Sequence, residues 1–527
     1  MNALQNPILR GFNPDPSIVR VGNDYYIATS TFEWFPGVQI HHSNNLSDWE
    51  LIGHPLDSTT LLDMKGVPDS CGVWAPCLTH DGERFHLVYS IIKSFDGVWK
   101  DTPNYLTTSK DITGPWNDPV FLGSYGFDGS MFHDDDGRKW FLSMLVDHRK
   151  GLFFGGIVMQ EYDLVEKRLV GPVHHIFKGT SLGITEGPHL YKIYGYYYLL
   201  TAEGGTDYGH AVTIARSENI TGSYEMHPEN PILHHGFQTD HVLQRTGHGD
   251  LVWDAEGACF MVFLAGRPLK KNRRCTLGRE TCIEKITWHN GWPYLSNRSK
   301  VARAVVTELP ESVSNRKDEF LNFSKDALSI HYQSLRIPIS KDWLWHDHKS
   351  GVLRIKGRES LSSTFEQSLI ARRVQHFEID YTARMKFQPT SFQNMMGLVC
   401  YYNTGHYYYL HVYGDEDEVS RWLNVICCDN FDTSELLASP LKISSEEIGL
   451  RILWKYDQLT FLVEGETGGW QDLGIMADAS ILSDDYVRDG GKQYRAAFTG
   501  SFVGVACQDL TGMGQSGAVL SLEYKEL

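Results

Sequence analysis

The N-terminal part of the chain contains an internal repeat, and this repeat limits the possible folds more than any other feature of the sequence. Each of five segments has a polar or aromatic residue, a short apolar strand, a turn with Gly and a second strand rich in aromatic residues. The segments follow one another at intervals of about 60 residues. Their leading residues are Asp15, Trp74, Asp128, Glu186 and His248.

A repeat of this length, made of strands and Gly turns, is typical of a β-propeller, in which each repeat forms one four-stranded blade around a central axis. Five copies therefore predict five blades. The innermost strand of each blade begins near the axis, so we expect the five leading residues to face one another in a central pocket. The alternative is an all-β protein without radial order, which the shared register of the five segments disfavours.

A charged stretch separates the repeats from a second region rich in predicted strands. Residues 377–387 alternate between apolar and polar side chains with a period of two, as a half-buried strand does. Similar alternation at 408–412 and 459–463 favours a sandwich of antiparallel sheets. We expect an all-β chain with a five-bladed β-propeller at 1–305, a linker at 306–323 and a C-terminal β-sandwich at 324–527.

Charge and composition exclude several classes of partner. The formal net charge of −17 argues against nucleic acid, because phosphate binding needs clustered Lys and Arg. No apolar run approaches the ~20 residues that cross a bilayer, so we expect no membrane partner. The first residues lack the pattern of a signal peptide, which predicts a cytoplasmic protein. Nine cysteines without a CxxC pair indicate neither a disulfide framework nor a zinc site.

Three acids among the leading residues point to the hydrolysis of a glycosidic bond. Asp15, Asp128 and Glu186 would meet in one pocket with Trp74 and His248. Such hydrolysis needs one carboxylic acid to protonate the leaving oxygen and a second carboxylate to act on water or on the sugar. Neighbouring carboxylates raise each other's pKa, so one of them can stay protonated near neutral pH. For any single acid the alternative is a structural role in a turn or an ion pair.

Six short motifs are spread over both predicted domains. They read FNPDPS at 12–17, YIATSTFEWFPG at 26–37, VWAP at 73–76, TEGPH at 185–189, GRET at 278–281 and FTGSFVG at 498–504. Together they closely resemble the β-xylosidases of glycoside hydrolase family 43, and the resemblance covers essentially the whole chain. It implies a five-bladed propeller followed by a concanavalin-like β-sandwich, in agreement with the repeat count.

The resemblance also implies a role for each acid. Asp15 would be the general base that activates water, Glu186 the general acid, and Asp128 the residue that orients Glu186 and adjusts its pKa. The mechanism would be inverting, which predicts carboxyl groups of Asp15 and Glu186 roughly 6.5 to 9.5 Å apart. The implied reaction releases xylose from the non-reducing end of β-1,4-xylo-oligosaccharides, with side activity on α-L-arabinofuranosides.

Four further residues are expected to bind the sugar. The resemblance makes Phe32 and Trp74 walls of the pocket and Arg279 a donor to sugar hydroxyls, although Trp74 could be plain core packing and Arg279 could pair only with Glu280 or another acid. His248 would lie near the pocket floor, where it binds sugar, holds a water or helps to coordinate a calcium ion as in some relatives. A buried histidine without a metal is at least as good an interpretation, and we expect no required cofactor.

The second domain is expected to complete the pocket. The resemblance places Phe498 or Phe502 on a loop of the sandwich that leans over the propeller. A pocket closed in this way admits only a chain end, which would restrict the enzyme to exo cleavage. We also expect a homo-oligomer.

Two segments depart from the pattern of the resembled family. Val146 stands before Asp147 where relatives usually carry Trp, so a stacking surface for the leaving-group sugar is in question. The loop PLKKNRRCTLG at 268–278 is shorter than in many relatives and strongly basic, which could widen the entrance or alter subunit contacts. An α-L-arabinofuranosidase and a carbohydrate-binding propeller without catalysis remain alternatives.

Overall fold

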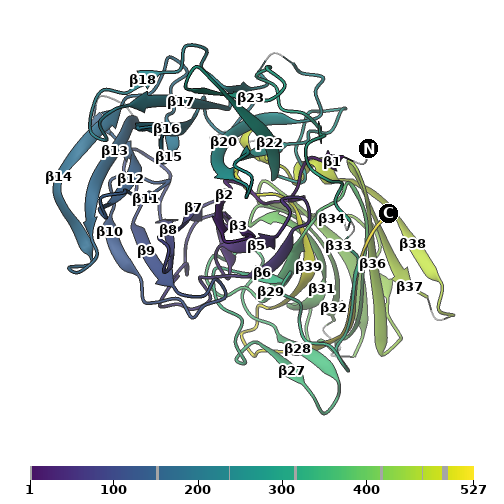
Figure 1. Cartoon of the computed structure of the whole chain (residues 1–527). Coiled ribbons are helices and arrows are strands. Elements are labelled where there is room, and N and C mark those ends of the chain that lie inside the picture. Colours follow the sequence, from purple (N-terminus) through teal and green to yellow (C-terminus); the bar gives the residue numbers. More distant parts are fainter. Residues whose placement is uncertain are drawn as a thin grey trace.

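A computed structural model describes residues 3–149, 153–236, 238–313, 317–415, 419–465, 467–489 and 496–527. Within these ranges nearly all regular structure is β-strand, and Figure 1 shows a ring of small sheets with a second body packed beside it. The all-β prediction, with five blades and a sandwich, is confirmed.

Five antiparallel sheets form the ring, and the chain completes each sheet before it starts the next. The first two blades comprise β2 (Ser17–Val21), β3 (Asp24–Thr29), β5 (Gln39–Ser43) and β6 (Glu50–Gly53), then β7 (Gly72–His80), β8 (Phe85–Ile92), β9 (Asn104–Ser109) and β10 (Val120–Gly123). The third comprises β11 (Ser130–His133), β12 (Lys139–Val146), β13 (Phe154–Asp163) and β14 (Arg168–Phe177). The last two comprise β15 (Glu186–Ile193), β16 (Tyr196–Glu203), β17 (Ala211–Ser217), β18 (Glu225–Met226) and β19 (Leu233–His234), then β20 (Gln244–Trp253), β21 (Cys259–Gly266), β22 (Arg279–His289) and β23 (Trp292–Leu295).

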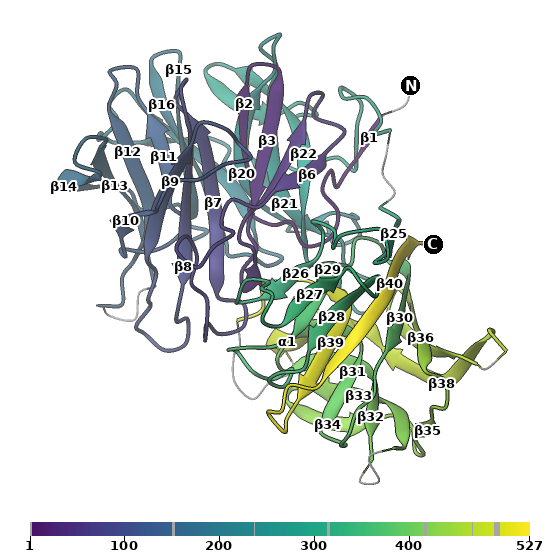
Figure 2. The ribbon, with the colours of Figure 1, turned by 90° about the horizontal axis from the view of Figure 1, so that it is seen from below.

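The second body is a sandwich of two antiparallel sheets, which Figure 2 shows beneath the propeller. One sheet comprises β25 (Glu319–Asn322), β27 (Leu344–Asp347), β28 (Val352–Lys356), β30 (Glu378–Lys386), β36 (Glu447–Lys455), β37 (Gln458–Glu464), β38 (Trp470–Asp478) and β40 (Ser516–Glu526). The other comprises β4 (Trp34–Phe35), β26 (Gln333–Leu335), β29 (Leu369–Arg373), β31 (Asn394–Asn403), β32 (His406–Gly414), β33 (Arg421–Asp429), β34 (Asp432–Glu435), β35 (Leu441–Lys442) and β39 (Phe502–Asp509). Outside the sheets lie the pair β1 (Leu4–Gln5) and β24 (Val305–Val306), the 3-10 turn η2 (Ala479–Ile481) and helix α1 (Asp484–Asp489).

The inner strands of the propeller explain why the leading residues converge. A residue in the left-handed region lies just before two of these strands, at Asp15 (φ 53°) and Asp128 (φ 56°), and within β20 at His248 (φ 48°). This backbone conformation costs a non-Gly residue roughly 1–2 kcal/mol, and strain of this kind is concentrated at functional sites. In this fold these strained residues are three of the five leading residues of the sequence repeat.

The two bodies share a sheet and a core. β4 lies between two strands of the first blade in sequence but pairs with β26 of the sandwich, with Phe35 opposite Ser334. The ring of Trp34 stacks on Phe502 with centroids 3.7 Å apart, and both rings are fully buried. An interface with core-like packing of this kind fixes the position of the sandwich relative to the propeller.

Across the described ranges, no helix combines the length and the apolar character of a membrane span.

Candidate active site

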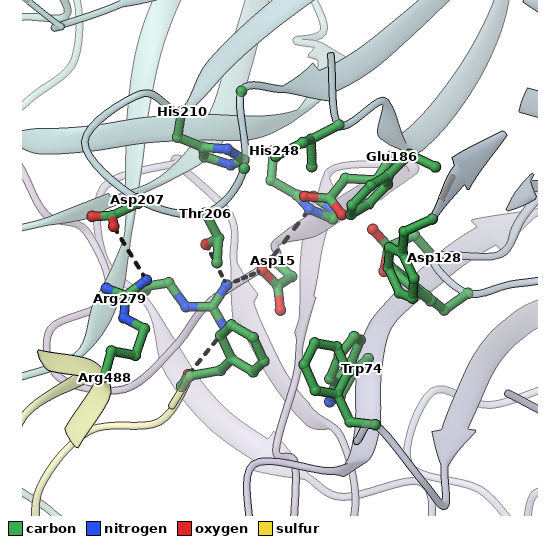
Figure 3. A pocket seen from close by; sticks show the side chains of 18 of the residues that line it. Asp15, Trp74, Asp128, Glu186, Thr206, Asp207, His210, His248, Arg279 and Arg488 are labelled. Carbon is green, nitrogen blue, oxygen red and sulfur yellow. Dashed lines mark hydrogen bonds and ion pairs between the residues drawn. The ribbon is translucent and has the colours of Figure 1, made fainter. Parts of the chain in front are cut away.

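A cavity of ≈ 590 Å³ opens at the axis of the propeller on the side that faces the sandwich. Its walls contain all five leading residues of the sequence repeat, which Figure 3 shows around one space (Asp15, Trp74, Asp128, Glu186 and His248). The repeat therefore brings together the residues that it was expected to bring together.

Asp15 is buried and held on both oxygens. The Ser30 hydroxyl donates to Oδ2 at 2.6 Å, and Arg279 donates from Nη1 to Oδ1 at 2.9 Å. Burial opposes ionisation of this carboxyl, but Arg279, His248 and the Ser30 hydrogen bond outweigh it and lower its pKa. Asp15 is therefore a carboxylate near neutral pH, as a general base must be.

Asp128 and Glu186 form the opposite side of the pocket. The backbone N–H of Gly187 donates to Asp128 Oδ2 at 3.1 Å, so Asp128 holds the start of the strand that carries Glu186. Burial, followed by the negative charges of Asp128 and Asp15, raises the pKa of Glu186 well above its ordinary value. Burial and the charge of Asp15 also raise the pKa of Asp128. The pocket thus holds an ionised Asp15 opposite Asp128 and Glu186, a pair of acids that retains a proton.

Arg279 connects Asp15 to the second domain. Besides Asp15, its guanidinium donates to Thr206 Oγ1 at 3.0 Å and to the carbonyl oxygen of Phe498 at 2.9 Å. The alternative partner Glu280 binds Arg267 instead, with Nε–Oε2 at 2.6 Å. Arg279 therefore fixes Asp15 and a sandwich loop in one network.

Aromatic rings form part of the cavity wall. Trp74 lies 5.8 Å from Phe32, 5.0 Å from Phe127 and 5.4 Å from Phe498 between ring centroids, and its indole N–H is satisfied by the carbonyl of Ser70 at 3.0 Å. The structure places Phe32, Trp74 and Phe498 in the wall, where they were expected.

Phe502 does not line this cavity. Its ring is fully buried, stacked on Trp34 and packed edge-on against Phe12 at 6.0 Å. Of the two phenylalanines expected to close the pocket, only Phe498 lines it, because the chain enters strand β39 at Phe502 and turns that ring into the shared core. The expected contact of Phe502 with sugar is therefore wrong.

His248 lies at the floor of the pocket, with Nδ1 3.9 Å from Asp15 Oδ1. Burial lowers its pKa to about 4, so the ring is neutral near pH 7. Gly187 makes room for it, because a Cβ at that position would lie 2.9 Å from the imidazole.

The surroundings of His248 do not fit a calcium ion. Ca²⁺ takes six to eight oxygen ligands. Asp15 is already paired with Arg279, and Asp250 Oδ2 accepts hydrogen bonds from Ser17 Oγ at 3.0 Å and Ile18 N at 2.8 Å. We therefore assign no step of the reaction to a metal.

A separate group of metal-ligand types lies at the other end of the inner strands. Among the described residues, Asp81, His86 and His133 have ligand atoms within 4.8 Å of one another. Lys139 Nζ already occupies the space between them, 2.8 Å from Asp81 Oδ2 and 2.9 Å from His133 Nδ1. The ammonium group of Lys139 thus takes the position that a metal ion would need.

Sequence reasoning missed the part of the pocket that is built from loops. Helix α1 of the sandwich brings Arg488, which pairs with Asp207 at 3.4 Å (Figure 3). Asp207 lies on a loop of the fourth blade that also brings Thr206 and Tyr208 to the pocket. Phe127 could have been found, because it directly precedes a leading acid of the repeat. The loop residues carry no repeated pattern.

The two segments that depart from the family pattern lie near this entrance. Next to the Val146 segment, the ring of His148 packs on Trp99, which is 69% exposed on the loop that also carries Lys100 of the pocket wall. Phe154, the pairing partner of Val146, and the neighbouring Phe153 also line the pocket, so the aromatic surface here comes from the second and third blades.

The basic loop at 268–278 contacts the sandwich of the same chain. Lys271 pairs with Asp457 at 2.8 Å, and Arg274 donates to Ser480 Oγ at 2.8 Å. Arg273 lies over the ring of Tyr208 at 4.4 Å. These contacts tie the positive charges of the loop to the domain junction.

Comparisons with known proteins define the class of this protein. The model of "Glycosyl hydrolases family 43" matches residues 4–293, and that of "Beta xylosidase C-terminal Concanavalin A-like domain" matches residues 321–524. The fold and the axial pocket are therefore those of a glycoside hydrolase with an appended concanavalin-like domain. The chain belongs to glycosyl hydrolase family 43.

Similar proteins match over their full length. The chain is 47% identical over 522 residues to "Xylosidase/arabinosidase 43B" of Humicola insolens, covering 97% of this chain and 96% of that protein. It is 44% identical over 536 residues to a "Beta-xylosidase" of Bacillus subtilis (strain 168), covering 99% of each. The crystal structure of xylan beta-1,4-xylosidase from Bacillus Halodurans C-125 superposes with a TM-score of 0.95 at 46% identity, covering 99% of this chain and 100% of that one.

Proposed function

We propose that this protein is an exo-acting β-xylosidase that removes xylose from the non-reducing end of β-1,4-xylo-oligosaccharides with inversion of configuration. The observation that carries the proposal is the pairing of an ionised Asp15 with a proton-retaining Glu186 in one closed-ended aromatic pocket. The names of the similar proteins support xylose as the sugar.

In this proposal each residue of the pocket has a separate role in the reaction. Asp15 accepts a proton from a water that attacks the anomeric carbon, and Glu186 donates a proton to the leaving oxygen. Arg279 keeps Asp15 ionised and presents further N–H groups to the sugar hydroxyls. Asp128 acts through Glu186 as a positioning residue, because it holds the backbone of Gly187 and adds the negative charge that raises the Glu186 pKa.

The closed end of the pocket explains the exo action. Phe498 and residues of helix α1 come from the sandwich and line the cavity. We infer that they close it on this side to a polysaccharide. Only a terminal sugar fits between the aromatic walls. The rest of the chain extends past the loops that carry Trp99 and Asp207.

The anomer of the first product tests the inverting mechanism. We expect NMR spectra taken in the first minutes of 4-nitrophenyl β-xyloside hydrolysis to show α-xylose, because water attacks the face opposite the leaving group. Intact linear xylan should yield xylose and no shorter internal fragments. β-Xylose as the first product would contradict the assignment of Asp15 as a base.

The pH dependence of kcat/KM tests the two protonation states. Asp15 is active when ionised, so activity falls as the pH drops through its pKa, which lies below the ordinary 3.8. Glu186 is active when protonated, so activity falls as the pH rises through its pKa, which lies well above the ordinary 4.5. Asp128→Asn removes a negative charge that raises the Glu186 pKa, and we expect the alkaline limb to move down by about one pH unit. An alkaline limb that stays in place or moves up would refute this role.

A second candidate activity is the hydrolysis of α-L-arabinofuranosides. The similarity to "Xylosidase/arabinosidase 43B" favours it as a side reaction in the same pocket. Rates on 4-nitrophenyl β-xyloside and 4-nitrophenyl α-L-arabinofuranoside under one set of conditions rank the two activities. A carbohydrate-binding protein without catalysis would release neither sugar.

A further inference from the structure

A second, smaller cavity lies where the propeller, the connecting segment and the sandwich meet. It measures ≈ 40 Å³ and is lined by polar side chains from all three parts of the chain. This volume exceeds the roughly 10–15 Å³ that one water needs. The side chains that matter here are Gln39 and His41 of the first blade, Lys317 of the connection, and Arg372 and Arg373 of the sandwich.

Arg373 is the unusual residue of this cavity. It is 4% exposed, donates from Nε to the carbonyl oxygen of Phe12 at 2.6 Å and from Nη1 to Gln333, and leaves Nη2 without a partner. In the described part of the chain it has no carboxylate partner, and burial alone lowers its pKa to about 9. Buried charges in proteins are ordinarily paired, because an isolated one is costly to desolvate.

Two neighbouring acids are already paired with other cations. Arg372 is occupied by Glu319 at 2.7 Å and Arg10 by Glu526 at 2.9 Å, so these acids already have cationic partners of their own. Lys317 lines the same cavity, and desolvation and the charge of Arg10 lower its pKa.

The cavity also offers free hydrogen-bond donors. Arg373 Nη2 and Arg372 Nε are buried and without partners, and His41 Nδ1 is a further buried nitrogen of this kind. Burial and the charges of Arg373 and Lys317 hold the pKa of His41 well below its ordinary value, so this ring is neutral and can donate from one nitrogen. Residues that carry free donors and positive charge therefore line one small cavity.

We propose that this cavity binds a small inorganic anion of the size of chloride or phosphate, with Arg373 as its main partner and Arg372 and His41 as further donors. The anion supplies the missing counter-charge to Arg373. Because Arg373 holds the carbonyl of Phe12, three residues before Asp15, the bound anion also fixes the segment that carries the general base to the sandwich. The site is separate from the sugar pocket and independent of the sugar that the enzyme prefers.

Thermal unfolding of the full chain tests the proposal. Protein in sodium gluconate, whose anion is too large for the cavity, is compared with protein in sodium chloride and in sodium phosphate at equal ionic strength. We expect chloride or phosphate to raise Tm saturably by about 2–5 °C, as a ligand of the native state does. The anion with the lower half-saturation concentration is the better occupant. Equal Tm values in all three salts overturn the proposal.

A crystal grown or soaked in sodium bromide locates the anion directly. We expect an anomalous bromide peak within hydrogen-bond distance of Arg373 Nη2. Density that scatters as water alone at this position in bromide overturns the proposal.

A carboxylate placed in the cavity should replace the anion. Gln39→Glu is nearly isosteric, and we expect it to raise Tm in gluconate and to abolish the response to chloride and phosphate. Gln458→Glu, at an exposed position of β37, is the matched control and should keep the full response. A Gln39→Glu protein that responds to the anions as the wild type does overturns the proposal, and the bromide experiment decides if the variant fails to fold.

Discussion

Asp15→Asn should lower kcat by roughly 10²- to 10⁴-fold, the contribution that a positioned general base makes. Asn keeps the shape of the side chain, its oxygen can still accept from Arg279 and its NH2 group can donate to the Ser30 hydroxyl, but it cannot take a proton from water. The loss should be of similar size on xylobiose and on aryl xylosides, because every substrate needs the activated water. Steady-state rates on both substrates measure it.

Two further observations complete this experiment. Asp57→Asn, at an exposed position of the same blade, should leave kcat unchanged. The Asp15→Asn protein should also unfold at a lower temperature, because Arg279 loses its carboxylate partner in a buried site. A variant that keeps more than a tenth of the wild-type kcat would show that Asp15 is not the base.

Glu186→Gln should give a loss that depends on the leaving group. The leaving group of xylobiose is a sugar alkoxide, which needs the proton of Glu186, so we expect roughly a 10²- to 10⁴-fold fall in kcat on xylobiose. The leaving group of a 2,4-dinitrophenyl xyloside is a stable phenolate, so this substrate should retain most of its rate. The ratio of the two losses is the measurement, and equal losses on both substrates would contradict the assignment of Glu186 as the acid.

Much of the fold could be predicted because the propeller is periodic. One repeat positions one blade, and the first residue of each repeat lies at the axis, so the acids and Trp74 could be assigned to one pocket from spacing alone. The roles of the acids could not be assigned in this way. They depend on the contacts of each carboxyl, such as Arg279 beside Asp15, and these contacts join residues that are far apart in sequence.

The rest of the site depends on features that have no period. Phe498 and Phe502 lie in one motif, and only the start of β39 decides that one ring faces the pocket and the other faces Trp34. Arg488 reaches the pocket from a short helix that lies outside the sequence repeat and could not be predicted from it. Trp34 and Phe35 lie between strands of the first blade, so nothing in the local pattern indicates that they join a sheet of the sandwich.

The pairing of β4 with β26 has a consequence for modular engineering. A cut between the two family domains would leave Trp34 and Phe35 with the propeller, so the isolated propeller would carry an unpaired strand edge and an uncovered tryptophan, both of which promote aggregation. The isolated sandwich would lack its terminal strand. A chimera that transplants the sandwich onto another hydrolase would therefore have to carry two residues from the far side of the junction with it.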